Sequence, residues 1–90
     1  MKSIIQDEKE CYMCGTNLNL HNHHIFPGRA YRKNSDKEGL TVYLCNYHHA
    51  YIHHDFKAML QLQKVAQKEF EKNKTREEFI KLFTKSVLED

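Results

Sequence analysis

The sequence predicts an α+β fold, in which a loop-rich N-terminal part with two strands and a helix precedes two C-terminal helices. Three observations predict it. A chain of 90 residues buries only about 60–65% of its unfolded surface, so one small domain held by an additional staple is expected. Residues 1–54 contain every Cys, His, Gly and Pro. Residues 55–90 contain none of these and are rich in Lys, Glu, Gln and Leu, which favour helix.

Residues 1–90 are expected to form one domain, with a compact unit at residues 11–54 and a helical extension at residues 55–90. The sequence contains no repeat and no linker that would divide it. Within the compact unit, CYMCG is typical of a metal knuckle, in which Gly15 supplies the tight turn.

Two short strands are expected in the compact unit. Residues 20–26 predict the first strand, which Pro27 and Gly28 end. Residues 40–45 (LTVYLC) are β-branched and aromatic and predict the second strand. The basic segment between them, residues 29–39, predicts a loop.

Three helices are expected after the second strand. Asn46 is a candidate cap for a helix through residues 46–56. The next helix should end near residues 73–74, where Asn and Lys interrupt the apolar spacing. Thr75 followed by Glu78 then forms a capping box for the last helix. The apolar stripes of the two C-terminal helices are Phe56, Met59, Leu60, Leu62, Val65, Ala66 and Phe70, then Phe79, Ile80, Leu82, Phe83 and Val87. These stripes are expected to be core, and a homodimer seam in the extension is the alternative.

Composition narrows the class of protein. The net charge of +2 permits a nucleic-acid partner but does not by itself indicate one. The N-terminus turns acidic and polar too early for a secretory leader, and no apolar run approaches the roughly 20 residues of a membrane span. A cytoplasmic protein with no membrane partner is expected, in which reduced cysteines more often bind metal than form disulfides.

Four residues carry the signature of a structural zinc site. Cys11-x-x-Cys14 and Cys45-x-x-His48 are two paired-ligand motifs, and tetrahedral zinc sites are usually assembled from such pairs. A closed site of this kind contributes about 10–16 kcal/mol of apparent binding energy to folding. The alternative is a redox pair of Cys11 and Cys14, with Cys45 buried in a strand.

A second set of histidines remains after this assignment. His49 and His53 are four residues apart and share one helix face, where two imidazoles can bind one cation. His48 points about 100° away from His49 around the same helix. On the first strand, His23 and His24 point to opposite sides, so one can bind metal while the other acts as a base.

The alternative is that these histidines are surface or core residues without a common purpose. Two more histidines, His21 and His54, do not fit the pattern. Each is an alternative ligand, a phosphate contact or, as the simplest interpretation, a solvent-exposed side chain.

The chain resembles the HNH endonucleases of the ββα-metal fold, and more narrowly the small zinc-containing HNH proteins common in bacteriophages. The resemblance covers about residues 11–54 and depends on CYMC, NHHIFPG and LCNYHHAYIH. It implies that His23 is a metal ligand and His24 the general base. It also implies that His49 is a metal ligand and that His53 occupies the place of a further ligand found in some members.

The activity that this resemblance implies is metal-dependent nicking or cutting of DNA, in a bacterial cell or a phage-infected host. Hydrolysis of the phosphodiester would use one divalent cation, Mg²⁺, Mn²⁺, Ni²⁺ or Zn²⁺, beside the structural Zn²⁺. Four basic residues are candidate contacts to the DNA backbone: Arg29, Arg32, Lys33 and Lys37. An ordinary solvated turn is the alternative for this basic segment.

One position departs from the family pattern. The Asn that precedes the second strand of the motif should fall near Leu40, where this chain has Gly-Leu-Thr. Asn22 and Asn34 are candidates to hold His24 in its place. A second interpretation is an inactive HNH scaffold that binds nucleic acid or inhibits a partner protein. A third is a zinc-stapled dimerisation unit that uses residues 55–90.

Overall fold

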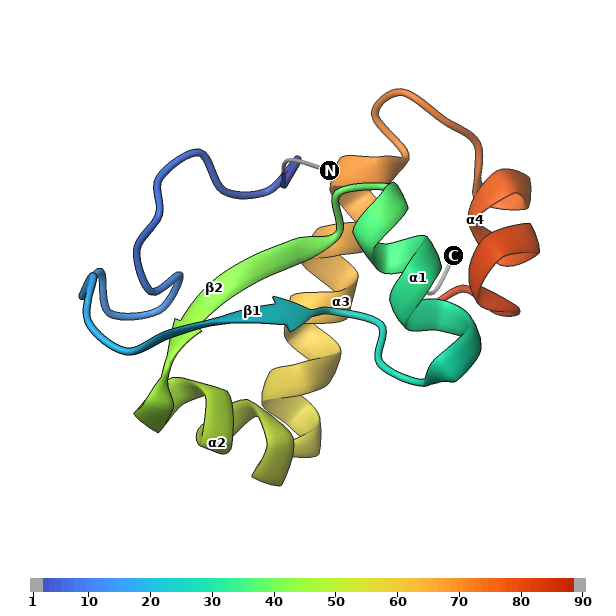
Figure 1. Cartoon of the computed structure of the whole chain (residues 1–90). Helices are drawn as coiled ribbons and strands as arrows, with labels where there is room; N and C mark the ends of the chain where they lie inside the picture. The colour runs from blue at the N-terminus through green and yellow to red at the C-terminus, as the bar shows by residue number, and fades with distance from the viewer. Residues whose placement is uncertain (1–2, 89–90) are drawn as a thin grey trace.

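A computed structural model describes residues 3–88, and Figure 1 shows the arrangement of its elements. The elements are β1 (Leu20–His24), α1 (Arg29–Lys37), β2 (Thr41–Cys45), α2 (Asn46–His54), α3 (Phe56–Phe70) and α4 (Arg76–Phe83). The predicted α+β class is confirmed. None of the helices in the described residues combines the length and the apolar character needed to span a membrane.

The two strands form one antiparallel sheet, whose register decides which side chains meet (Figure 1). Leu20 lies opposite Cys45, and His24 lies opposite Thr41. Because side chains alternate along a strand, His21 and His23 point to one face of β1 while His24 points to the other. Helix α2 begins directly after β2, so it lies beneath the end of the sheet at which β1 starts.

The segment between the strands is a helix, so the predicted loop at residues 29–39 is wrong. Helix α1 begins after Gly28 and ends before Gly39, whose φ of 74° suits glycine. Its one buried residue is Ser35, beside the half-buried Tyr31 and Asn34. Hydrophobic periodicity is the main sequence signal for a helix. The helix was not predicted because the inward side of α1 is largely polar and therefore gives no apolar stripe.

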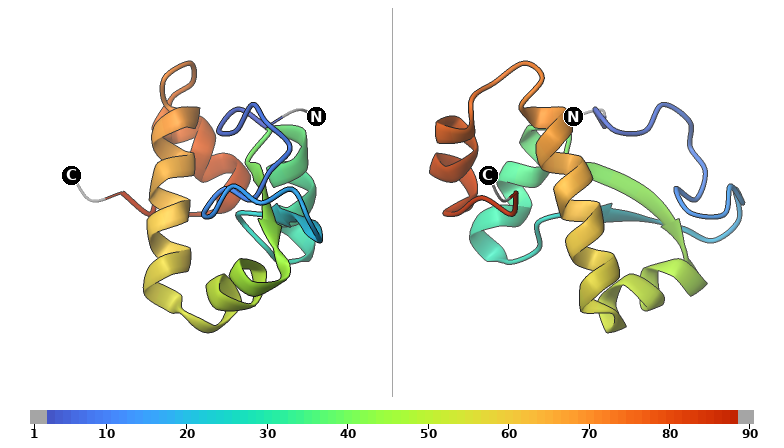
Figure 2. Two further views of the ribbon diagram at one scale, coloured as in Figure 1. Left: turned by 90° about the vertical axis from the view of Figure 1, so that its left-hand side faces the viewer. Right: turned by 180° about the vertical axis from the view of Figure 1, so that it is seen from behind.

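Helices α3 and α4 supply much of the core. In the right-hand view of Figure 2 the long α3 crosses in front of the sheet, and α4 lies beside α1. The ring of Phe79 lies 5.3 Å from that of Phe26 and 5.4 Å from that of Phe70, as aromatic pairs prefer. Phe56 was expected in the core but is 79% exposed, since it is the first residue of α3 and lies at the outer end of the helix.

Of the two predicted helix caps, the structure contains the one at Thr75 but not the one at Asn46. The capping box is confirmed: the Thr75 hydroxyl accepts from the Glu78 N–H at 3.1 Å, and the Glu78 carboxylate accepts from the Thr75 N–H at 2.9 Å. Asn46 is not a cap, because Cys45 occupies the cap position of α2 and the Asn46 side chain pairs with His21 instead. Strand β1 ends at His24, two residues earlier than expected.

Candidate metal centre

The four residues of the predicted zinc site come together at one end of the sheet. The ligand atoms of Cys11, Cys14, Cys45 and His48 all lie within 4.8 Å of one another. The Nδ1 of His48 is 3.3 Å from the Cys45 sulfur and 3.6 Å from the Cys11 sulfur. The sulfurs of Cys14 and Cys45 are 3.9 Å apart. These three cysteines are free thiols, so the distances do not come from a disulfide.

These separations match the edges of a tetrahedral zinc site. Zinc bound at about 2.3 Å from sulfur and about 2.0–2.1 Å from imidazole nitrogen places its ligands about 3.4–3.8 Å apart. The four residues can therefore hold a metal such as zinc with little rearrangement. Four protein ligands fill a tetrahedral site, which makes a structural role the natural one.

Local hydrogen bonds hold the first cysteine pair against the sheet. The Gly15 N–H donates to the Cys11 carbonyl at 2.8 Å, closing the expected tight turn, and the φ of Gly15 is 79°. The Tyr12 N–H donates to the Tyr43 carbonyl of β2 at 2.8 Å. This bond ties the knuckle to the strand that carries Cys45.

The thiols of the knuckle differ in acidity. Burial opposes ionisation of Cys11, but the backbone N–H groups of Cys45, Cys14 and Met13 donate to its sulfur and lower its pKa to about 6. The N–H of Thr16 acts in the same direction on Cys14, where desolvation and the two neighbouring thiols outweigh it and raise the pKa. Cys11 is thus prepared as a thiolate, the form that binds metal.

A second cluster lies on the α2 side of β1. The ligand atoms of His23, His49 and His53 lie within 4.8 Å of one another. The Nε2 atoms of His49 and His53 are 3.3 Å apart, and two imidazoles on one tetrahedral zinc would be about 3.3–3.4 Å apart. His23 is buried, His49 half-buried and His53 exposed, so the cluster is open to solvent on one side.

His23 carries the clearest sign of a missing partner. Its side chain is 2% exposed, and its Nε2 is buried without a hydrogen-bond partner in the described residues. Buried polar atoms in proteins are nearly always paired, so this nitrogen calls for an explanation. Burial, followed by the nearby His53, His49 and His24, lowers the pKa of His23 to about 4. A neutral imidazole with a free nitrogen is what a metal ligand requires.

His21 has a role that the sequence left open. Its ring stacks on that of His49, with 4.8 Å between centroids and 12° between planes, and its Nε2 pairs with the Asn46 side chain. His21 therefore braces one member of the second cluster. The alternation of β1 predicted that His21 and His23 share a face, which is the signal that could have found it. His54 lies outside both clusters, exposed at the end of α2.

His24 lies on the opposite face of β1, away from the second cluster. Its Nε2 is 3.8 Å from a carboxylate oxygen of Asp36 on α1, and its side chain is 25% exposed. Of the two asparagines predicted to hold His24, Asn34 is engaged elsewhere, whereas Asn22 shares the β1 face of His24 but makes no hydrogen bond with it within the described part of the chain. The Asn34 side chain donates to the Leu82 carbonyl at 2.8 Å, and Asn22 is exposed.

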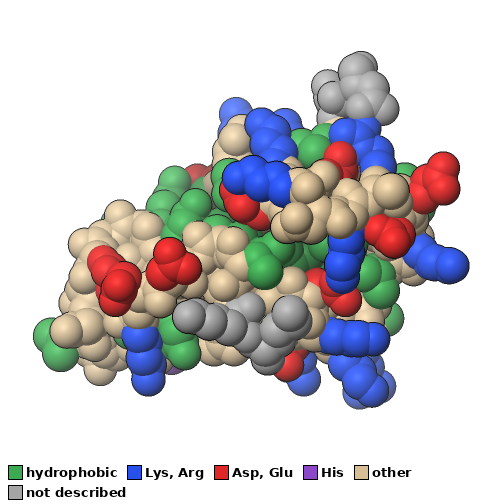
Figure 3. Space-filling model, turned by 90° about the horizontal axis from the view of Figure 1, so that it is seen from above, with side chains coloured by type: hydrophobic (Ala, Val, Ile, Leu, Met, Phe, Trp, Pro, Cys, Tyr) green, Lys and Arg blue, Asp and Glu red, His purple; other side chains and the backbone are tan. Residues whose placement is uncertain are grey.

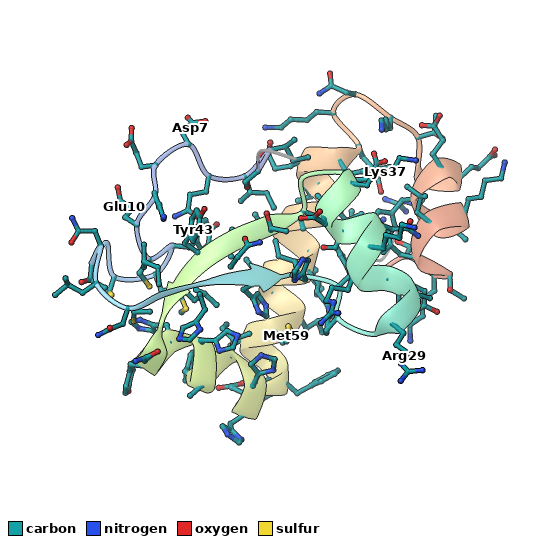
Figure 4. All side chains as sticks on the ribbon, in the orientation of Figure 1. Asp7, Glu10, Arg29, Lys37, Tyr43 and Met59 are labelled. Carbon is teal, nitrogen blue, oxygen red and sulfur yellow. The ribbon has the colours of Figure 1, made fainter. Side chains whose placement is uncertain are left out.

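The predicted basic residues all lie on α1 and are exposed: Arg29, Arg32, Lys33 and Lys37. Figure 4 shows the first and last of them at opposite ends of the helix. Their spacing places them on one side of α1, the side that also carries Asp36. Figure 3 shows the surface seen from above, where Lys and Arg side chains are interspersed with Asp and Glu. This face of the molecule is therefore of mixed charge and not uniformly positive.

The two clusters offer different chemistry. The first combines three cysteine sulfurs and an imidazole in a closed set, whereas the second combines three imidazoles with an open side. Comparison of the chain with protein-family models, with curated proteins and with solved structures finds no match. The function must therefore be inferred from these side chains.

Proposed function

We propose that this chain is a metal-dependent DNA endonuclease of the HNH type, in which β1, β2 and α2 form a ββα-metal unit. The observation that carries the proposal is the second cluster of His23, His49 and His53, with its unpaired buried nitrogen. One metal staple can stabilise a domain of this size, and the first cluster can provide it. A second set of potential metal ligands, open to solvent on one side, supports a catalytic role for a metal ion bound there.

The donor set of the second cluster suits a divalent cation of the later transition series. Three neutral imidazoles suit Zn²⁺ or Ni²⁺, although the abundance of Mg²⁺ or Mn²⁺ can decide which ion is used. When bound, such an ion would supply positive charge to the scissile phosphate. His21 would contribute by keeping the His49 ring in place through stacking.

His24 is the proposed general base. Because it points to the face of β1 opposite His23, its ring stays free when its neighbour binds a cation. The half-buried side chain is reachable by water. In its neutral form the imidazole takes a proton from the water that attacks phosphorus.

The basic side of α1 is the proposed contact to the DNA backbone. Arg32 and Lys33 lie within one helical turn of Asp36, which contacts His24. Cationic side chains at this place would hold the phosphates that flank the scissile bond near the base. Such contacts position the duplex without reading its sequence, so weak sequence preference is expected.

A binding module without turnover is the second candidate. It is favoured by the Asn34 side chain, which donates to the Leu82 carbonyl of α4 and is therefore not available to hold His24. The mixed charge of the surface in Figure 3 also suits a protein partner. This candidate predicts salt-sensitive binding to DNA, or binding to a protein, with no metal-dependent cleavage.

Plasmid nicking separates the two candidates. Protein that retains its structural zinc is mixed with supercoiled plasmid, and Mg²⁺, Mn²⁺, Ni²⁺ or Zn²⁺ is added separately. The endonuclease proposal expects nicking by wild type and by His54→Ala, and none by His24→Ala. Absence of nicking by folded, zinc-loaded wild type with every metal would contradict the endonuclease and leave the binding module.

A further inference from the structure

We propose that Asp36 positions the imidazole of His24, as the carboxylate partner that this chain uses in place of the missing motif asparagine. The inference rests on the proposed function, in which His24 is the base. Its direct observation is the 3.8 Å contact between the Asp36 carboxylate and the Nε2 of His24. In the described part of the chain, Asp36 is the one acidic residue within 4 Å of that ring nitrogen.

The residue next to Asp36 ties α1 to the end of β1. Ser35 is completely buried, and its hydroxyl donates to the Leu40 carbonyl at 2.5 Å. The same hydroxyl accepts from the Phe26 N–H at 3.4 Å, and the Leu40 carbonyl also accepts from the Ile25 N–H at 3.1 Å. Ile25 and Phe26 directly follow His24. One side chain therefore fixes the backbone of Asp36 relative to the backbone of His24.

A second anchor holds the same turn of α1 from the other side. The Asn34 side chain donates to the Leu82 carbonyl of α4 at 2.8 Å, and the Tyr31 hydroxyl lies 2.6 Å from that of Thr84. Asp36 thus lies beside two anchored residues. Its own side chain is 53% exposed, and its carboxylate approaches the Nε2 of His24 to 3.8 Å, which is ion-pair distance and longer than a hydrogen bond.

The contact with Asp36 bears on which ring nitrogen of His24 carries the proton. A carboxylate only accepts hydrogen bonds, so a neutral His24 that donates to Asp36 through Nε2 would carry its proton on that nitrogen. The lone pair then lies on Nδ1, on the other side of the ring, where it can accept a proton from water. The contact selects the orientation and the tautomer that a base requires, as carboxylate partners of catalytic histidines do. Asp36 is a positioning residue, since it acts through His24.

The kinetic test compares two substitutions at one position. Asp36→Ala removes the acceptor, and we expect kcat for plasmid nicking to fall about 10- to 100-fold with little change in DNA affinity. Asp36→Asn keeps an acceptor oxygen and should retain most of the activity. Glu77→Gln, which neutralises an exposed carboxylate on α4, serves as the control for the change in net charge. Unchanged activity in Asp36→Ala, or equal loss in both variants, would overturn the inference.

A spectroscopic test does not depend on cleavage. At pH 8 a free imidazole is neutral, and ¹⁵N NMR distinguishes its tautomers, with His24→Ala used to assign the signal. We expect the Nε2–H form in wild type and in Asp36→Asn, and a mixture of tautomers in Asp36→Ala. The same tautomer population in wild type and Asp36→Ala would refute the contact. If wild type shows the contact but never nicks DNA, the proposed function fails and the interaction of Asp36 with His24 stands by itself.

Discussion

His48 and His49 are adjacent on α2 and yet belong to different clusters. The Nδ1 of His48 lies 3.3 Å from the Cys45 sulfur, whereas the Nε2 of His49 lies 3.3 Å from that of His53. A helix turns about 100° per residue, so one short helix can serve two metal sites. This separation allows each site to be tested by a substitution at a neighbouring position.

Substitution of His48 should destroy the fold, and substitution of His49 should not. His48→Ala removes one of four structural ligands, and a structural zinc contributes about 10–16 kcal/mol to folding. We expect His48→Ala to lose zinc and its cooperative thermal transition by circular dichroism. His49→Ala is the matched control and should keep both. Equal zinc content and melting in wild type and His48→Ala would contradict the assignment of the first cluster.

Loss of His53 should weaken the second metal site. Removal of one of three imidazoles is expected to lower the affinity for Ni²⁺ more than about tenfold, since even outer partners of metal ligands are worth 10- to 100-fold. Calorimetric titration of zinc-loaded protein measures this. His54→Ala, an exposed neighbour outside the clusters, should bind like wild type. Identical affinity in the two variants would argue against a cation on His53.

His21 should support the second site without binding the metal. Because its ring stacks on His49 at 4.8 Å, His21→Ala is expected to lower Ni²⁺ affinity about 10-fold. His21→Phe keeps a flat ring but cannot pair with Asn46, and it should recover part of that loss. If His21→Phe lost as much affinity as His53→Ala, His21 would be a ligand and not a brace.

Protein without a second metal should lose stability in mild acid because of His23. The pKa of His23 is about 4 in the folded chain, whereas the ordinary pKa of an exposed histidine is 6.5. Between these pH values His23 is protonated in the unfolded chain but neutral in the folded chain. The free energy of unfolding therefore keeps the full contribution of His23 above pH 6.5 and decreases as the pH is lowered. The slope for one group is at most about 1.4 kcal/mol per pH unit.

Chemical denaturation between pH 6.5 and 5, with zinc kept bound, measures this slope. His23→Gln removes the titrating group and should show a flatter dependence on pH. The other titrating groups, including the zinc ligands, are shared by the two proteins, so their contributions cancel in the comparison. Parallel curves would show that His23 is not held neutral by the fold.

The aromatic core should depend on Phe79 and not on Phe56. Phe79 is fully buried, so Phe79→Ala is expected to lower the free energy of unfolding by about 3–5 kcal/mol. Phe56 is 79% exposed, and Phe56→Ala should change stability by less than about 0.5 kcal/mol in a monomer. Sedimentation checks the oligomeric state. A large effect of Phe56→Ala with a concentration-dependent dimer would place Phe56 in a homodimer seam.

The ligand clusters could be predicted because their signals are local. Paired ligands in Cys11-x-x-Cys14 and Cys45-x-x-His48 are separated by one turn of chain, which by itself brings each pair to one side. The spacing of His49 and His53 works in the same way on a helix. The capping box at Thr75 is also a local interaction, and it was found for that reason.

Contacts between distant segments were decided by the tertiary structure. Helix α1 has a polar inward side built on Ser35, so nothing in its periodicity predicts a helix, yet it brings Asp36 to His24. The stack of His21 on His49 depends on how β1 pairs with β2 and on where α2 then begins. The sequence by itself determined which residues can bind metal. Strand register and helix packing decided which side chains brace them, because such contacts join segments whose separation along the chain carries no periodic signal.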